Sequence, residues 1–341
     1  MNWFHDLNMR QAQRDPSLEV FPHEFDLILG KLRGRVFYHT VEVQRRQTAC
    51  WTYVSDGLTA LQHKELALAF LCPPGRKKWQ FSADPLHLFE NVYQQASQGN
   101  RVDVEWGFTE FGRPGFLGSV EFRGLGYIAA QPLADLGISW ESMLAPIVLK
   151  ADELQVARQF GMARIMARLG QMYLHYPCPP WNDVTRPEVI TLKEMEQSLL
   201  VRTPLARVPG ITVRMEGNLI RMRARAASAE SLRGISQLPE DAVVGILTDL
   251  DPQANACLVW TPGSAQPTAI SAPGSDGKIL SGAFALFVPQ QDSSWGQVVE
   301  DGFVVMLGDE DWADLRRALI ECQPYSLPPA ENQNGFALDW A

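Results

Sequence analysis

The chain has 341 residues, of which 46% are hydrophobic and 20% are charged, and its formal net charge is −9. This length is typical of two domains, or of one large domain with insertions, and the hydrophobic fraction is sufficient for a sizeable buried core. No apolar run approaches the ~20 residues of a membrane-spanning helix, and the N-terminal segment lacks the pattern of an export signal. We therefore expect a cytoplasmic protein with no membrane partner.

The negative charge is concentrated in the second half of the chain. Residues 184–341 contain 12 Lys and Arg against 20 Asp and Glu, whereas residues 1–183 contain 18 against 19. An acidic half would repel the phosphates of a nucleic acid. We therefore expect no nucleic-acid partner.

Five cysteines are scattered along the chain, and none forms a Cys-x-x-Cys pair. An odd, dispersed set without an export signal is typical of reduced, mostly buried thiols. None of them lies in a basic or helix-N-terminal setting that would activate a thiolate. The sequence therefore predicts neither a disulfide framework nor a cysteine nucleophile.

Three strand-like segments follow one another near the N-terminus. Residues 36–43 are rich in aromatic and β-branched side chains, which favour a pleated strand. A second segment, TACWTYVSDGL, ends at Ser55-Asp56-Gly57, where an Asp acceptor and a flexible Gly predict a tight turn. A third, ELALAFLCP, is stopped by Pro73-Pro74-Gly75.

A helix is predicted over residues 82–100. Asp84 is a suitable N-cap, Pro85 suits the first helical position, and Gly99 marks the end. Apolar residues recur at helical spacing and predict a buried stripe. The stripe contains Leu86, Phe89, Val92, Tyr93 and Ala96.

Strand-like segments at 102–108, 119–133 and 142–149 precede a second predicted helix over residues 151–170. In this helix Arg164 and Arg168 lie one turn apart and predict a basic ridge. Gly170 is the predicted C-terminal stop.

A proline-rich segment, YPCPPWNDVTRP (176–187), predicts a stiff connector between two domains, residues 1–180 and 181–341. Beyond it, residues 210–226 predict a hairpin that turns at Gly217-Asn218. Short apolar strands follow, and residues 309–323 predict a helix with acidic residues in its first turn. The buried stripe of that helix contains Trp312, Leu315, Ala318 and Leu319.

Metal and cofactor patterns are weak. His63, Cys72 and His87, with Asp84 nearby, do not have the paired spacing of zinc ligands. Residues 249–255, DLDPQAN, alternate oxygen-bearing side chains as a calcium loop does, but they lack its central glycine and distal glutamate. Segments 112–118 and 123–129 contain glycines without a phosphate-binding frame. We expect no metal and no cofactor.

A hydrolytic site can be assembled only formally. Ser55, Asp56 and His63 supply the residue types of a serine hydrolase, but there is no Gly-x-Ser-x-Gly motif. With six histidines and 39 acidic residues in the chain, such combinations arise easily. A metal- or serine-dependent hydrolase, using these residues or a metal at His63 and His87, is the alternative hypothesis, and we expect no catalytic residues.

Aromatic and basic residues instead indicate a binding surface. Tryptophan and tyrosine favour protein contacts, and the densest basic run, residues 76–78, is followed directly by a tryptophan and can face an acidic partner. The predicted partner-binding residues are Trp51, Tyr53, Asp56, Arg76, Lys77, Lys78 and Trp79.

The order of these segments resembles the suppressor-of-fused family over roughly residues 25–170. In that family a strand and turn of the form YVS-G-S/T-L leads to a strand similar to FELTF, then to a helix, and later to an element containing EEL. This chain has Gln62-His63-Lys64 where the family has a glycine-rich lead into the second strand. The matching positions are Tyr53, Val54, Ser55, Gly57 and Leu58, then Glu65, Leu66, Leu68 and Phe70, and finally Glu153, Leu154 and Gln155.

The resemblance implies an α+β protein: an N-terminal mixed α/β domain of suppressor-of-fused type, followed by a second, smaller α+β domain. It also implies that the protein binds and sequesters another protein without catalysis. Animal members of the family sequester a transcription factor, and bacterial relatives resemble immunity proteins that neutralise a toxin. We therefore expect a protein partner, with a toxin as one form of it.

Overall fold

The computed structural model describes residues 22–341 except 101–106, 113–114, 120, 236–238, 240 and 265. Contacts divide the chain into two compact units. Unit 1 comprises Met1–Leu154 and Pro180–Pro187, and unit 2 comprises Gln155–Pro179 and Glu188–Ala341.

The chain passes between the two units more than once near the proline-rich connector. Residues 155–179 pack within unit 2, and residues 180–187 return to unit 1. The compact units therefore differ from the predicted division at residue 180, and the second unit is not the smaller one. The sequence did not show this arrangement because it depends on contacts between segments far apart in the chain.

Unit 1 is built on a mixed sheet of seven strands within the described residues, in the order β1-β2-β3-β4-β7-β6-β5. Its neighbouring strands are antiparallel, except that β4 and β7 run parallel. The strands are β1 (His23–Ile28), β2 (Leu32–Val43), β3 (Arg46–Asp56), β4 (Glu65–Leu71), β5 (Phe108–Glu110), β6 (Phe122–Ala129) and β7 (Met143–Lys150).

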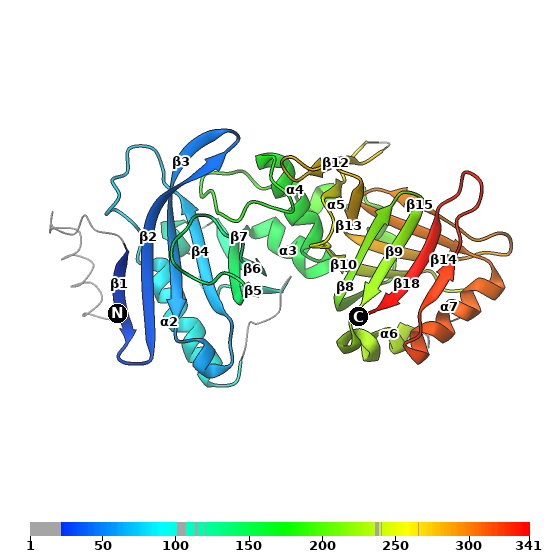
Figure 1. Ribbon diagram of the computed structural model, residues 1–341, viewed down its shortest axis with the longest axis horizontal. Helices are drawn as coiled ribbons and strands as arrows, with labels where there is room; N and C mark the ends of the chain where they lie inside the picture. Colours follow the sequence, from blue (N-terminus) through cyan, green and yellow to red (C-terminus); the bar gives the residue numbers. More distant parts are fainter. Residues whose placement is uncertain are drawn as a thin grey trace. The chain divides into compact units, whose positions relative to one another are not determined.

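Alternation along β3 and β4 directs side chains to opposite faces of this sheet. Trp51, Tyr53 and Phe70 belong to the core that contains residues of α2 (Asp84–Ser97). Val54 and Ala67 belong to a separate cluster. Figure 1 shows α2 beside the strands of this sheet.

The predicted stripe of α2 is confirmed for Leu86, Phe89, Val92 and Ala96, which are buried, whereas Tyr93 is half-buried. The predicted N-cap at Asp84 is wrong, because Asp84 is already the first helical residue. Ala83 occupies the cap position and supplies no capping side chain.

Asn182 fills the gap where β4 and β7 diverge. Its side-chain carbonyl accepts from the Val148 amide at 2.8 Å, and its side-chain amide donates to the carbonyls of Ala69 and Pro146 at 3.0 Å each. The Leu71 amide also donates to the Asn182 carbonyl at 2.9 Å. Residues 180–187 thus complete the hydrogen bonding of the sheet, which explains why they belong to unit 1.

The second predicted helix is two helices, α3 (Ala151–Phe160) and α4 (Ala163–Tyr173). Gly161 has φ +77°, a left-handed conformation that ends α3 and that glycine adopts without strain. The predicted stop at Gly170 is wrong, because α4 continues to Tyr173 and its C-cap is Leu174.

Unit 2 contains an eleven-stranded sheet within the described residues. One path runs β12-β11-β13-β8-β10-β14-β16-β15, and β8 also pairs with β9, which continues through β18 to β17. The hairpin predicted at Gly217-Asn218 is confirmed as the connection between β8 and β9. The strands are β8 (Leu205–Glu216), β9 (Leu219–Ala224), β10 (Val244–Asp249), β11 (Ala256–Val259), β12 (Thr268–Ser271), β13 (Ile279–Gly282), β14 (Phe284–Pro289), β15 (Trp295–Val299), β16 (Gly302–Leu307), β17 (Tyr325–Leu327) and β18 (Gly335–Trp340).

The helix predicted over residues 309–323 is α7 (Asp309–Glu321), and its predicted buried stripe is confirmed. These side chains share one core with α6 (Ala229–Ile235) and with the sheet. Figure 1 shows both helices beside the strands of this unit. The remaining short helices are η1 (Thr59–Leu61), η2 (Phe116–Gly118), α5 (Leu192–Met195), η3 (Leu199–Arg202) and η4 (Ala226–Ser228).

The predicted α+β class is confirmed, because both units combine helices with mixed sheets. In the part of the chain that the structure describes, the helices are too short or too polar to span a bilayer.

Candidate functional site

The Ser55-Asp56-Gly57 segment is organised by the buried carboxylate of Glu65. The Ser55 hydroxyl donates to Glu65 Oε2 at 2.5 Å, and the amides of Gly57 and Thr59 donate to Glu65 Oε1 at 3.0 and 2.9 Å. Ser55 Oγ in turn accepts from the Leu66 amide at 2.8 Å. The serine therefore joins β3 to β4, as a structural residue does.

The formal hydrolase set is not assembled around Ser55. Its hydroxyl is paired with Glu65, while His63 Nδ1 donates to the Lys64 carbonyl at 2.6 Å. Asp56 is exposed at the end of β3. No serine–histidine hydrogen bond of the kind that activates a nucleophile is present among these described residues.

Metal-binding geometry is also not formed by the sequence candidates. Among the described residues, which include His63, Cys72, Asp84 and His87, no group of three or more His, Cys, Asp or Glu side chains could hold an ion. In the calcium-like segment, Asp251 is buried and accepts from Arg214 Nη1 at 3.0 Å. Arg214 therefore already pairs with the Asp251 carboxylate that a calcium ion would need as a ligand.

The cysteines have the character of buried thiols. Cys50, Cys178 and Cys257 are buried, and burial raises the pKa of Cys50 and of Cys178 to about 12. Burial also raises the pKa of Cys72, although nearby Arg76 acts in the opposite direction. These thiols remain protonated near neutral pH and are poor nucleophiles.

Residues 72–83, which we call the basic loop, connect β4 to α2 and are fixed by hydrogen bonds. Trp51 Nε1 donates to the Lys78 carbonyl at 2.8 Å, and the Lys77 amide donates to Gln80 Oε1 at 2.9 Å. The Gln80 amide donates to the Lys77 carbonyl, also at 2.9 Å. The loop therefore has a defined conformation before any partner binds.

An apolar pocket of about 90 Å³ lies beside the basic loop, and we call it the anchor pocket. Its aromatic residues come from β3 and β4, where Tyr53 and Phe70 meet edge to face with ring centroids 6.1 Å apart. All of its lining residues belong to unit 1. They are Trp51, Tyr53, Phe70, Leu71, Pro73, Arg76, Gln80, Ser82, Leu117 and Val184.

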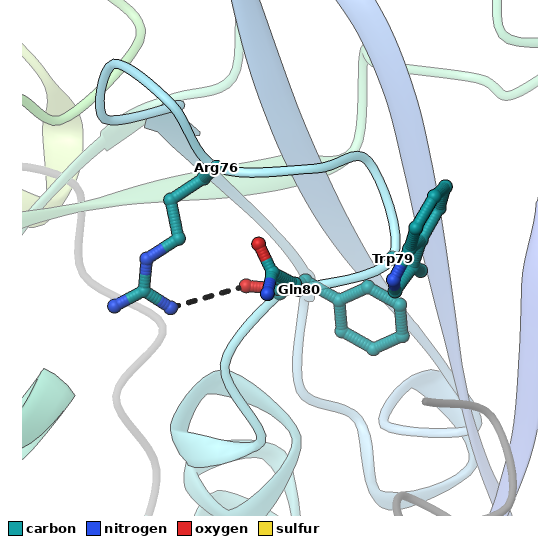
Figure 2. Close-up of a pocket in the computed structure, with 4 residues that line it drawn as sticks. Arg76, Trp79 and Gln80 are labelled. Atoms are coloured by element: carbon teal, nitrogen blue, oxygen red, sulfur yellow. Dashed lines mark hydrogen bonds between the residues drawn. The ribbon is translucent and has the colours of Figure 1, made fainter. Parts of the chain in front are cut away.

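A wider hollow of about 250 Å³ adjoins the anchor pocket and shares Arg76 and Gln80 with it. Figure 2 shows Arg76 extending toward Gln80, with Trp79 on the other side of Gln80. Arg76 Nη1 donates to the Gln80 carbonyl at 3.4 Å. The two hollows therefore lie side by side, the anchor pocket mainly apolar and the wider hollow mainly polar, and Arg76 lines both.

Two of the three cations of the basic loop are directed to solvent. Arg76 and Lys77 are exposed, and within the described residues neither forms an ion pair with an acidic side chain. Lys77 Nζ lies 5.2 Å from the centroid of the Trp79 ring, a cation–π contact. The loop thus keeps positive charge available beside an apolar pocket.

Six of the seven residues predicted to bind a partner lie in or beside this surface, and Asp56 lines neither hollow. Trp51 and Tyr53 are buried, so they form part of the wall of the anchor pocket. Burial also raises the pKa of Tyr53, which keeps its phenol protonated. Whether these residues bind a partner stays a prediction.

The sequence did not point to Leu117 and Val184, because they reach the pocket from distant parts of the chain. Leu117 has φ +55° within η2, a left-handed conformation that is unusual for leucine. No local pattern in either segment signals a place at the pocket.

In unit 2, the predicted basic ridge is not a surface. Arg164 is 1% exposed and forms a two-pronged contact with Asp301, in which Nε donates to Oδ2 at 2.7 Å. It also donates to Glu300 at 2.9 Å and stacks on Trp260 with the guanidinium carbon 4.4 Å from the ring centroid. The predicted basic ridge is wrong for Arg164, because this side chain is buried and paired with Asp301 and Glu300.

Comparison with known proteins assigns more than half of the chain to one family by sequence. Residues 138–336 match the family described as Smad anchor for receptor activation-like, C-terminal. Zinc finger FYVE domain-containing protein 9 of Homo sapiens is 26% identical over 296 residues, which is 82% of this chain. That alignment covers 20% of the human protein, so the chain corresponds to about a fifth of the length of this relative.

Solved structures similar to the chain include suppressor of fused, the family that the sequence motifs resemble. The crystal structure of Drosophila suppressor of fused has a TM-score of 0.38 and 11% identity, and the alignment covers 98% of this chain and 95% of that one. The crystal structure of a Sufu–Fu complex also has a TM-score of 0.38, with 15% identity, covering 55% of this chain and 90% of that one.

Proposed function

The chain belongs to the family of Smad anchor for receptor activation-like C-terminal domains, and from this premise we propose that it is a non-catalytic protein that binds another protein. In this proposal unit 1 contributes a docking surface made of the anchor pocket and the basic loop. The name of the family describes an anchor, and an anchor acts by holding a partner. The proposed site of action is the cytoplasm.

The observation that carries the proposal is the anchor pocket with exposed cations at its rim. Ligand sites are concave and mostly apolar, with a few polar groups that fix orientation. Here Arg76 is the one charged residue among those that line the anchor pocket. The same unit places its catalytic-looking serine in a structural hydrogen bond with Glu65, which favours binding over hydrolysis.

Site-specific photo-crosslinking in living cells tests the proposal. A photoreactive phenylalanine replaces Pro74, an exposed residue of the basic loop, and in a matched variant it replaces Gln47, an exposed residue of β3. We expect a discrete protein adduct from position 74 and none from position 47. No adduct at position 74, or equal adducts at both positions, would contradict a docking surface here.

The finer form of the proposal is that the partner is a toxin which the protein neutralises. It is supported only by the sequence resemblance to bacterial immunity proteins. Co-expression with each neighbouring gene tests it: rescue of growth from a toxic neighbour supports neutralisation. A stable complex with a harmless partner would leave protein binding intact and remove the immunity role.

A further inference from the structure

The anchor pocket is mainly apolar and the basic loop is cationic, so each recognises a different chemical feature of a partner. Resting on the proposed function, we propose that this surface binds an extended acidic segment of a partner protein that inserts one branched aliphatic side chain into the anchor pocket. The pocket selects the anchor, and Arg76 and Lys77 select the flanking carboxylates.

The size of the anchor pocket selects an aliphatic anchor. Its volume is about 90 Å³, whereas an apolar protein cavity that accepts benzene has a volume of about 150 Å³. This smaller volume suits the side chain of a leucine, isoleucine or valine better than an indole ring. Burial of such a side chain contributes about 1.5–3 kcal/mol, which favours a single anchor as the centre of the contact.

The charge of the rim selects acidic flanking residues. The basic loop contributes Arg76, Lys77 and Lys78 and contains no acidic residue between positions 72 and 83. The contact of Arg76 with the Gln80 carbonyl, at 3.4 Å, engages one of the five N–H donors of its guanidinium. The remaining donors suit the two oxygens of a carboxylate.

Because the basic loop already has a fixed conformation, it loses little conformational entropy when a partner binds. Trp51 and Gln80 already hold the backbone around Lys77 and Lys78. Ordering a flexible loop on binding costs free energy, and a loop that is already ordered in the unbound protein avoids this cost. The partner segment is therefore recognised by a surface that is present in the unbound protein.

Selection from a random peptide library displayed on phage tests the inference with the full chain as bait. We expect enriched peptides to share one aliphatic residue flanked by Asp or Glu. The double variant Arg76→Glu/Lys77→Glu should weaken a selected peptide about tenfold. A peptide with lysines in place of its acids should recover binding to that variant.

Two further variants make the result specific. Val184→Trp fills the anchor pocket from its edge and should abolish selection of the aliphatic anchor, while a thermal melt reports whether the variant is folded. Arg45→Glu/Arg46→Glu makes the same change in net charge at two exposed residues, one in the turn before β3 and one at the start of β3, and it should leave binding unchanged.

The remaining outcomes separate this inference from the proposed function. Site-dependent peptides that lack acids, or that insert a tryptophan, would overturn the occupant and preserve docking at this surface. Failure to enrich any site-dependent peptide would overturn the inference, and the cross-link at position 74 would then decide the proposed function. Sedimentation with phosphatidylcholine vesicles containing phosphatidylserine, lost in Arg76→Glu/Lys77→Glu, would assign the cations to a membrane surface and also overturn the inference.

Discussion

Cations on α4 of unit 2 and cations of the basic loop in unit 1 look similar in the sequence, but the fold uses them differently. Arg164 is enclosed by Asp301 and Glu300, and its charge is neutralised inside the unit. Arg76 and Lys77 are exposed beside an apolar pocket. The fold therefore neutralises the cation of α4 internally, whereas it leaves Arg76 and Lys77 exposed, as the proposed docking surface requires.

The comparison predicts its largest effect at Arg164. In Arg164→Met, Asp301 and Glu300 lose their countercharge in the interior, and breaking a buried pair in this way typically costs about 3–5 kcal/mol. We expect a loss of this size in the free energy of unfolding, measured by urea denaturation followed by circular dichroism.

Arg317→Met is the matched control for Arg164→Met. The Arg317 side chain is 64% exposed and pairs with Asp314 on the surface of α7, so its loss should cost less than about 1 kcal/mol. Equal effects of the two variants would show that the buried cluster contributes no more than a surface pair.

A second prediction concerns the turn after β3. Gly57 has φ +129°, and a Cβ at this position would lie 2.1 Å from the Lys31 carbonyl oxygen. Gly57→Val combines this clash with a strained backbone and should destabilise the protein by about 3 kcal/mol or more. A thermal melt of the variant measures the loss.

Gly30 provides the control for Gly57. It also has a positive φ, +66°, but no atom lies within 4 Å of a Cβ built there. Gly30→Val therefore reports the cost of backbone strain without the clash and should be the milder change. Unaltered melting of Gly57→Val would contradict the turn described here.

Ser55→Ala should have a smaller effect than Gly57→Val. The substitution removes a donor to Glu65 and an acceptor for the Leu66 amide, and leaving buried polar groups unpaired costs about 1–3 kcal/mol. Urea denaturation measures the loss. Retention of wild-type stability, together with loss of a hydrolytic activity, would instead identify Ser55 as a nucleophile.

The smallest effect on stability is expected for Arg76→Glu/Lys77→Glu. Both side chains are exposed, and surface substitutions of this kind usually change stability by less than about 0.5 kcal/mol. A thermal melt should therefore coincide with that of the unmodified protein. Marked destabilisation would show that these cations support the fold, as Arg164 does, and would remove the contrast between the two regions.

Much of the fold was predictable from local patterns. The strand ending at Ser55-Asp56-Gly57, the hairpin at Gly217-Asn218 and the buried stripe of α7 depend on periodicity and turn chemistry within a few residues. The burial of Arg164 was not predictable, since Asp301 lies 137 residues away in the sequence. The break at Gly161 was missed because apolar spacing continues across it.

The candidate site was predictable only in part, for the same reason. Trp79 and the adjacent cations form a visible run, and Trp51 and Tyr53 alternate within a strand. Leu117 and Val184 complete the pocket from segments whose glycines and prolines indicate turns and a connector rather than a place at a pocket. Their place depends on how η2 and residues 180–187 return to the sheet, which is a property of the tertiary fold.

Hydrogen–deuterium exchange of the full chain, with and without the most enriched library peptide, tests the central claim most directly. We expect amide protection to increase in residues 72–83 and around Leu117 and Val184, and to stay unchanged around Arg164. Protection that appears in unit 2 while the basic loop stays unaffected would contradict a docking surface in unit 1.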